Sequence, residues 1–192
     1  MKRVGVLSLQ GDFAAHGAAL ERAGAEVVYV REPEQLAGLD GLVLPGGEST
    51  TMLKLLQAEG WFANLAEFGK KKPMFGTCAG AILMARDVSN PEQDSLGLMD
   101  IGVERNAYGR QIDSRVAEIE PEPEFAKRSK PGKMQAVFIR APIIRRVGAG
   151  VKVLARYQGD VVLAEEGRHL VATFHPELTP DSRVHELFLE RL

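Results

Sequence analysis

The sequence predicts a three-layer α/β fold, in which a mostly parallel central sheet is flanked by helices and gains antiparallel strands in its second half. In the first half, short apolar runs alternate with helical patterns, which is typical of a parallel sheet covered by helices. These apolar runs are continuous rather than alternating, as expected for strands that are buried on both faces. From Asp100 onward the patterns are mostly those of strands. We therefore expect the antiparallel additions in this half.

The first half supplies four expected strands, at residues 4–9, 27–30, 42–44 and 74–75. We expect Asp12 to cap the first helix, which Gly24 stops, and Ser49 to cap the second helix, which ends near Gly60. Two further helices are expected at residues 61–68 and 79–85. The last of these is small and apolar all round, which predicts that it is buried.

The second half supplies six expected strands, at residues 101–104, 115–119, 136–139, 151–155, 161–164 and 170–174. The charged, proline-rich segment 120–133 is expected to be an exposed loop. We expect the final helix to have Thr179 as its cap and Pro180 at its first position. Its apolar face is then formed by Val184, Leu187 and Phe188. Together these elements predict one flavodoxin-like domain over residues 1–192.

The composition is that of an ordinary globular chain, with 192 residues, of which 45% are hydrophobic and 26% charged. The net charge of -2 gives no basic footprint for nucleic acid. The single cysteine excludes an intramolecular disulfide. The first apolar run is too short for a signal peptide, and no stretch approaches the roughly 20 apolar residues of a membrane span. We therefore expect a soluble, cytoplasmic protein with neither nucleic-acid nor membrane partners.

A G-x-C-x-G sequence, Gly76-Thr77-Cys78-Ala79-Gly80, lies between an expected buried strand and an expected buried helix. This context matches a nucleophile elbow, the sharp turn that lifts a nucleophile above a sheet. Glycines provide the clearance that such a turn needs. The helix N-terminus favours the thiolate, which is the reactive form of cysteine. A buried structural cysteine is the alternative, but the five-residue pattern favours Cys78 as a nucleophile.

A partner for proton transfer is expected at His175-Pro176-Glu177, which follows the apolar run of residues 170–174. The histidine then lies at the end of a strand, and the carboxylate two residues later is placed to orient its imidazole. Cys78, His175 and Glu177 would form a triad by role. The alternative is a strand-end histidine beside a surface glutamate.

The other three histidines have weaker claims to chemistry, and we expect them to be structural or exposed. They are His16 in the first helix, His169 before a strand and His185 in the last helix. Zinc ligation by Cys78, His175 and Glu177 is disfavoured, because a His-x-Glu pair with one distant cysteine lacks the usual ligand spacing. No metal is therefore expected.

The segment Pro45-Gly46-Gly47-Glu48-Ser49 also follows an expected strand directly. Glycines at this point can aim backbone N–H groups at a developing oxyanion, so we expect an oxyanion hole formed by the amides of Gly47 and Ala79. A phosphate-binding loop is disfavoured because the glycine spacings of the known phosphate motifs are missing. A simple turn is the remaining alternative.

Four candidate sites each come directly after an expected strand: Gln10-Gly11, Gly46-Gly47, Cys78 and His175. If those strands are parallel, all four meet at the carboxyl edge of the sheet, where α/β proteins bind ligands. The sequence therefore predicts one active site at this edge.

The elbow and the His-Pro-Glu turn resemble those of the class I, triad-type glutamine amidotransferases. More narrowly, the chain resembles the family of glutaminase subunits of pyridoxal 5'-phosphate synthase over essentially its whole length. The most specific stretches are residues 46–51 (Gly-Gly-Glu-Ser-Thr-Thr) and 138–142 (Phe-Ile-Arg-Ala-Pro). Other matching stretches are residues 9–12, 75–80, 103–106, 108–111 and 174–179, whereas 121–133 has no confident match.

The resemblance implies that the Cys78, His175 and Glu177 triad hydrolyses L-glutamine, with no cofactor. It also implies that the ammonia passes to a barrel-shaped, oligomeric synthase subunit. Residues that would contact glutamine by this resemblance are Gln10, Gly46, Gly47, Glu48, Ser49, Arg105, Ile139 and Arg140. Bidentate pairing of the α-carboxylate suits Arg105 or Arg140, although either could instead be a surface ion-pair residue.

Two other classes of function are compatible with the same scaffold. One is a different cysteine hydrolase or a thiol stress protein, which would turn over peptides or aldehydes. The other is a non-enzymatic regulatory subunit, whose function would survive loss of the Cys78 thiol. For the glutaminase, the loop at residues 45–49 is a candidate switch, because a misoriented peptide there would disable the oxyanion hole until the partner binds.

Overall fold

The computed structural model describes residues 1–107 and 114–192, and one large sheet dominates it. Ten strands of these residues belong to this sheet. In spatial order they are β2 (Glu26–Val30), β1 (Arg3–Leu7), β3 (Gly41–Leu44), β4 (Met74–Thr77), β12 (His169–Ala172), β11 (Asp160–Glu166), β9 (Ile143–Val147), β6 (Met99–Glu104) and β5 (Ala85–Ser89), with β10 (Lys152–Tyr157) paired to β11. A separate two-stranded sheet joins β7 (Ser114–Ile119) to β8 (Met134–Ile139).

The parallel part of the sheet contains β2, β1, β3, β4 and β12, and all neighbouring pairs in this series run in the same direction. Strand β11 then pairs antiparallel with β12, β9 and β10, and β9 pairs antiparallel with β6. The expected α/β fold with antiparallel additions in the second half is therefore confirmed. Strands β3, β4 and β12 are buried at every position, as their continuous apolar sequences indicate.

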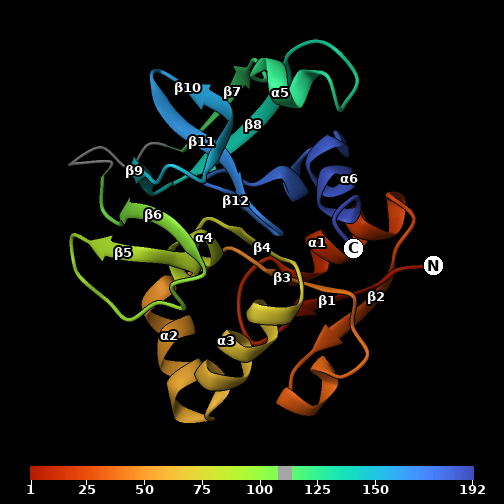
Figure 1. Cartoon of the computed structure of the whole chain (residues 1–192), viewed down its shortest axis with the longest axis vertical. Coiled ribbons are helices and arrows are strands. Elements are labelled where there is room, and N and C mark those ends of the chain that lie inside the picture. Colours follow the sequence, from red (N-terminus) through yellow and green to blue (C-terminus); the bar gives the residue numbers. More distant parts are fainter. Residues whose placement is uncertain (108–113) are drawn as a thin grey trace.

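Helices cover both faces of the sheet (Figure 1). On one face, α2 (Ser49–Ala58) and α3 (Trp61–Lys71) pack together and share a core with α4 (Ala79–Met84). On the other face, α1 (Phe13–Arg22) contacts α6 (Arg183–Leu189), and their apolar side chains join a second core with Phe75. Short helical turns lie at η1 (Pro33–Leu36), α5 (Pro123–Ala126) and η2 (Pro176–Leu178).

Three of the expected helix caps differ from the structure. Asp12 stands at the N-cap position of α1 but makes no capping hydrogen bond with its side chain. Helix α2 begins at Ser49 itself, and its cap is Glu48, whose carboxylate is long enough to accept from two backbone amides. Helix α6 begins only after Ser182, because the turn η2 ends at Leu178 and the chain is extended at Thr179.

Two strands and three short helical turns, η1, α5 and η2, are absent from the expected elements. Strand β5 follows α4 without a loop, and β9 was missed because two of its five residues are arginines. The segment 120–133 is not simply an exposed loop, since it contains α5, whose Phe125 is fully buried. The final helix also holds this segment in place. Arg183 is only 4% exposed and donates to the carbonyls of residues 130, 132 and 133 while pairing with Asp181.

Among residues 1–107 and 114–192, none of the helices combines the length and the hydrophobicity needed to cross a membrane.

The contacts of Arg183 with Asp181 and with the carbonyls of residues 130, 132 and 133, here called the Arg183 clamp, give a first prediction. Replacing Arg183 with Met removes a buried guanidinium and leaves the carbonyls of residues 130, 132 and 133 and the carboxylate of Asp181 without their donor, so the free energy of unfolding should fall by about 2–4 kcal/mol. Urea unfolding followed by circular dichroism measures this change. The exposed Arg156 is the matched control, because Arg156→Met should change the free energy by less than about 0.5 kcal/mol. Equal effects of the two substitutions would contradict the clamp.

Candidate active site

Cys78 lies on the turn between β4 and α4, in a backbone conformation that L-residues rarely adopt. Its φ is 51° and its ψ is -108°, which is strained for a residue with a side chain. The Cys78 amide donates to the carbonyl of Ala172 at 2.9 Å, which fixes the turn to the neighbouring strand β12. Such strain is characteristic of functional turns, and here it matches the nucleophile elbow that the sequence predicts.

The two glycines of the G-x-C-x-G sequence are explained by close packing. A Cβ on Gly76 would lie 2.5 Å from the backbone of Gly80, and a Cβ on Gly80 would lie 2.0 Å from the carbonyl oxygen of Leu44. Neither contact is possible for a real side chain, so only glycine lets α4 begin so close to β3 and β4. The clearance expected from the sequence is therefore confirmed.

His175 reaches the same edge of the sheet because β12 pairs in parallel with β4. The register places Ala172 opposite Thr77, so the chain leaves both strands at the same level. The amide of His175 then donates to the carbonyl of Val137 at 2.8 Å, which ties the turn to strand β8. Cys78 and His175 are thereby brought together from distant parts of the sequence.

The imidazole of His175 is held between Cys78 and Glu177. Its Nδ1 lies 2.6 Å from Oε1 of Glu177, and its side chain is almost fully buried. Burial lowers the pKa of His175, but hydrogen bonds to Cys78 and Glu177, together with their negative charges, outweigh burial and raise this pKa to about 10. The ring is thus a cation at neutral pH and is placed to stabilise a thiolate on Cys78.

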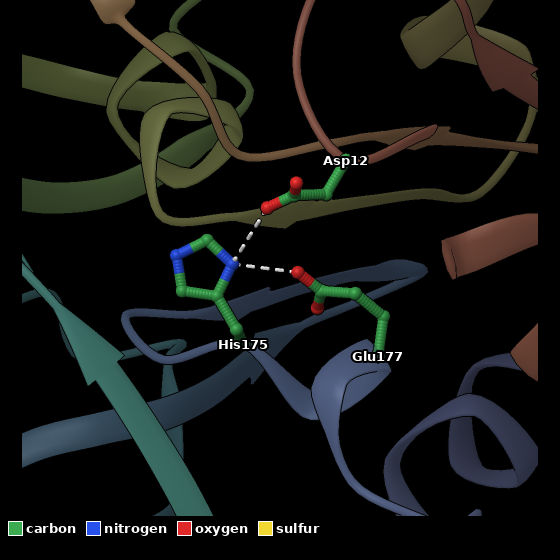
Figure 2. Close-up of side chains that lie close together, drawn as sticks. All are labelled: Asp12, His175 and Glu177. Carbon is green, nitrogen blue, oxygen red and sulfur yellow. Dashed lines mark hydrogen bonds and ion pairs between the residues drawn. The ribbon is translucent and has the colours of Figure 1, made fainter. Parts of the chain in front are cut away.

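Two carboxylates approach the same nitrogen of His175 (Figure 2). Besides Glu177, whose side chain is fully buried, Oδ2 of Asp12 lies 3.5 Å from Nδ1. Asp12 stands at the start of α1, but its carboxylate lies next to His175. This explains why the side chain does not cap the helix. The sequence stretch 9–12 was singled out, but the role expected for Asp12 there was wrong.

The loop at residues 45–49 covers the Cys78–His175 pair. A Cβ on Gly46 would lie 2.6 Å from Cε1 of His175 and 3.2 Å from Cβ of Cys78, so only glycine allows the loop to lie this close. The carbonyl of Gly46 accepts from the amide of Asp12 at 3.2 Å. Gln10 lies against the next residue, because a Cβ on Gly47 would meet its side-chain oxygen at 2.3 Å.

The start of α2 is held by charged side chains on both sides. The carboxylate of Glu48 accepts from the hydroxyl and amide of Thr51 and from the amide of Thr50, and these hydrogen bonds lower the pKa of Glu48 to about 2. On the other side, Nη2 of Arg105 donates to the hydroxyls of Ser49 and Thr50 at 2.9 and 2.7 Å. These contacts fix the loop next to Cys78.

A cavity of about 300 Å³ opens over the Cys78 sulfur. Of the residues that the resemblance implies for glutamine, Gly46 and Gln10 do not line this cavity. Its lining includes Gly47, Glu48, Ser49, Ala79, Arg105, Ile139 and Arg140. It also includes Asp12, Asn106 and Pro142, which lie in the matching stretches but were not expected to contact glutamine, and Ile82, which lies outside those stretches. The Cys78 sulfur also lies 4.0 Å from the carbonyl of Ile139. The matching stretch 108–111 falls in the part of the chain that the structure does not describe.

One group of potential metal ligands occurs among the described residues, formed by Asp12, His175 and Glu177, with ligand atoms within 4.8 Å of one another. The short hydrogen bond between His175 and Glu177 occupies two of these ligands. A metal ion there would have to displace the shared proton and break the pair that orients the imidazole.

The three remaining histidines are all buried, and one of them contacts the candidate triad. Nε2 of His16 lies 3.3 Å from Oε2 of Glu177, while its Nδ1 lies 3.0 Å from Nε2 of His185. His169 instead accepts from the amide of Met74 at 3.2 Å. No local sequence signal distinguishes His16 from His169, since the contact depends on how α1 packs against η2.

Comparisons with known proteins agree with this geometry. Residues 6–192 match the family described as the SNO glutamine amidotransferase family. A protein of Solibacter usitatus named pyridoxal 5'-phosphate synthase subunit PdxT is 71% identical over 192 residues, which is the whole of both chains. A protein of the same name from Koribacter versatilis is 57% identical over 189 residues, or 98% of this chain and 94% of its own.

Solved structures show the same fold. A crystal structure described as a glutamine amidotransferase is 46% identical, has a TM-score of 0.88 and matches 98% of this chain and 97% of its own. A chain in the structure of PurLQS from Thermotoga maritima, only 18% identical, has a TM-score of 0.72 over 98% of this chain and 97% of its own. The second likeness concerns the fold alone.

The close approach of Gly46 gives a second prediction. Gly46→Ala should push the His175 ring away from the sulfur and slow alkylation of Cys78 by iodoacetamide about tenfold or more. The reaction is specific because Cys78 is the only cysteine. Gly102→Ala is the matched control, since its Cβ would meet Arg146 at 3.3 Å, a milder overlap than the 2.6 Å at Gly46, and it should leave the rate unchanged. An unchanged rate in Gly46→Ala would show that the loop does not constrain the pair.

The pKa of His175 gives a third prediction. This pKa is raised from 6.5 to about 10, so protonation of the ring stabilises the fold fully below pH 6.5, and that contribution is lost as the pH rises toward about 10. Glu177→Gln removes one cause of the shift and should flatten this decline. Chemical unfolding across this pH range measures it, with the exposed Glu21→Gln as control. Parallel curves for wild type and Glu177→Gln would refute the assignment.

Proposed function

Because the chain belongs to the SNO glutamine amidotransferase family, we propose that it is the glutaminase subunit of a pyridoxal 5'-phosphate synthase. It hydrolyses L-glutamine to L-glutamate and supplies the ammonia to a synthase subunit. Residues 1–192 act as one class I amidotransferase domain. The observation that carries this proposal is the strained Cys78, which lies beside a buried imidazole that is itself hydrogen-bonded to Glu177.

In the first half of the reaction, the Cys78 thiolate attacks the side-chain amide carbon of glutamine. A bond forms between sulfur and carbon, and the electron pair of the carbonyl moves onto oxygen. The backbone N–H groups of Gly47 and Ala79 stabilise this oxyanion. The first amides of a helix have no partner within it, so Ala79 at the start of α4 is suited to this role. His175 then gives its proton to the departing ammonia as the carbon–nitrogen bond breaks.

In the second half, water attacks the glutamyl thioester. His175, now neutral, takes a proton from the water, and Glu177 stabilises the imidazolium that forms again. The carbon–sulfur bond breaks, glutamate leaves and the thiolate returns. Every proton that His175 gives to ammonia is thus recovered from water, and the reaction needs neither cofactor nor metal.

The cavity has the polar groups that recognition of glutamine requires. The guanidinium of Arg105 lines it, and Nε of this residue is buried without a hydrogen-bond partner among the described residues. Arg105 therefore pairs with the α-carboxylate of glutamine in this proposal, and Arg140 in the same lining adds a second positive charge. Ser49, Glu48 and Ile139 complete the wall, and Gln10 and Gly46 support Gly47 from behind.

The partner is a barrel-shaped, oligomeric synthase subunit, which receives ammonia through an internal passage. Ammonia must be kept from bulk water because it is protonated there, and a docked partner provides this shelter. The loop at residues 45–49 serves as an activation switch, since a change at Gly46 or Gly47 would move an oxyanion donor. The cytoplasmic location expected from the composition remains a prediction.

The proposal predicts how ammonia release depends on Cys78. The wild-type chain with a candidate synthase subunit should release ammonia from glutamine, and Cys78→Ala should lower the rate by about 10³-fold or more, because no covalent intermediate can form. A coupled glutamate dehydrogenase assay with and without the partner measures this. The activation switch requires a slower rate without the partner, and equal rates would refute it. Absence of ammonia release in every wild-type condition would overturn the glutaminase itself.

A further inference from the structure

The second carboxylate oxygen of Glu177, Oε2, has no hydrogen-bond donor within the triad. Oε1 of Glu177 binds His175, but Oε2 is buried and has no hydrogen-bond partner of good geometry among the described residues. An ionised carboxylate in a fully buried position needs donors on both oxygens, or it rotates to find them. The nitrogen placed to serve Oε2 is Nε2 of His16, at 3.3 Å.

His16 is a neutral histidine in a closed environment. Its side chain is fully buried, and burial together with the neighbouring His185 and His175 holds its pKa well below the usual value. A neutral imidazole has one N–H donor and one bare acceptor nitrogen, so the tautomer decides what His16 offers to Glu177. A bare Nε2 would face the carboxylate with a lone pair, whereas a protonated Nε2 would donate to it.

His185 favours the arrangement in which Nε2 of His16 carries the proton. Its Nε2 lies 3.0 Å from Nδ1 of His16, and its Nδ1 is buried with no partner among the described residues. A buried acceptor without a partner is tolerated better than a buried N–H without one, so the proton of His185 belongs on Nε2. This N–H donates to Nδ1 of His16, which leaves the proton of His16 on Nε2. The hydroxyl of Thr77 lies 3.0 Å from the same Nε2 and is then an acceptor for its N–H, with Oε2 of Glu177 beside it at 3.3 Å.

We propose that His16, fixed by His185 as the Nε2-protonated tautomer, is a positioning residue that holds Oε2 of Glu177 and so aims the Glu177–His175 pair at Cys78. This inference rests on the proposed function for its kinetic consequence. His16 does not line the cavity over Cys78, and in this proposal it acts through Glu177. Hydrogen bonds that orient metal ligands from behind contribute about 10–100-fold to activity, and we expect an effect of similar size for this contact.

Kinetics of the full chain with its synthase partner test the proposal. His16→Leu should lower kcat for glutamine hydrolysis by about 10–100-fold and change KM by less than about twofold, because the cavity is left intact. His16→Gln should recover most of the loss, since its amide places an N–H donor close to the position of Nε2. Equal rates for the two variants, or a loss that falls on KM rather than kcat, would overturn the proposal.

His169→Leu is the matched control for loss of a buried histidine. His169 lies on β12, its Nδ1 accepts from Met74, and it has no contact with Glu177 in the described structure. This variant should lose stability but keep its kcat. If kcat fell as far as in His16→Leu, the effect would be structural rather than positional, and the proposal would fail.

The tautomer itself is tested without any assay of activity. The chain has four histidines, so ¹⁵N-histidine NMR of the full-length protein gives few signals. His16 should show a protonated Nε2 and a bare Nδ1. Its Nδ1 should also show a scalar coupling across the hydrogen bond to Nε2 of His185. A protonated Nδ1 or a charged ring would overturn the inference, even if glutamine is hydrolysed. Conversely, failure of the glutaminase reaction would leave this measurement valid.

Discussion

The parallel pairing of β4 with β12 is the constraint on which the site depends. The register that sets Ala172 opposite Thr77 releases both chains at the same edge, and the amide of Cys78 is bound to the carbonyl of Ala172. The nucleophile and its imidazole are therefore held just beyond the ends of two fully buried strands. Strand β3 pairs with the other side of β4 and delivers the Gly46-Gly47 turn above both groups.

Charge is arranged in layers behind this edge. The sulfur faces a buried imidazolium, the imidazolium faces the carboxylates of Glu177 and Asp12, and Glu177 faces the neutral ring of His16. Each buried charge thus has a partner of opposite sign or an N–H dipole, which offsets the cost of removing it from water. Helix α1 contributes to two of these layers, because Asp12 precedes it and His16 lies one turn further along.

The parts of the site that could be predicted from the sequence are those built from neighbouring residues. The G-x-C-x-G turn, the His-x-Glu pair and the glycine loop each have a local pattern, and their meeting follows from parallel strands. The contact between His16 and His185 joins residues 169 positions apart through the packing of two helices, so no local sequence pattern predicts it. Caps were less predictable, because Glu48 and Ser49 are neighbouring polar residues and either one can accept from the first amides of α2.

The central claim is that Cys78 forms a covalent bond with the glutamyl group and that His175 then directs water to it. Acid quenching of the chain with glutamine and its synthase partner, followed by mass spectrometry of the intact protein, tests this most directly. Since Cys78 is the only cysteine, a thioester can form at one place alone. The account predicts the added mass of one glutamyl group on the wild-type protein and no added mass on Cys78→Ala. Glutamine turnover without any adduct on the wild-type protein would contradict it.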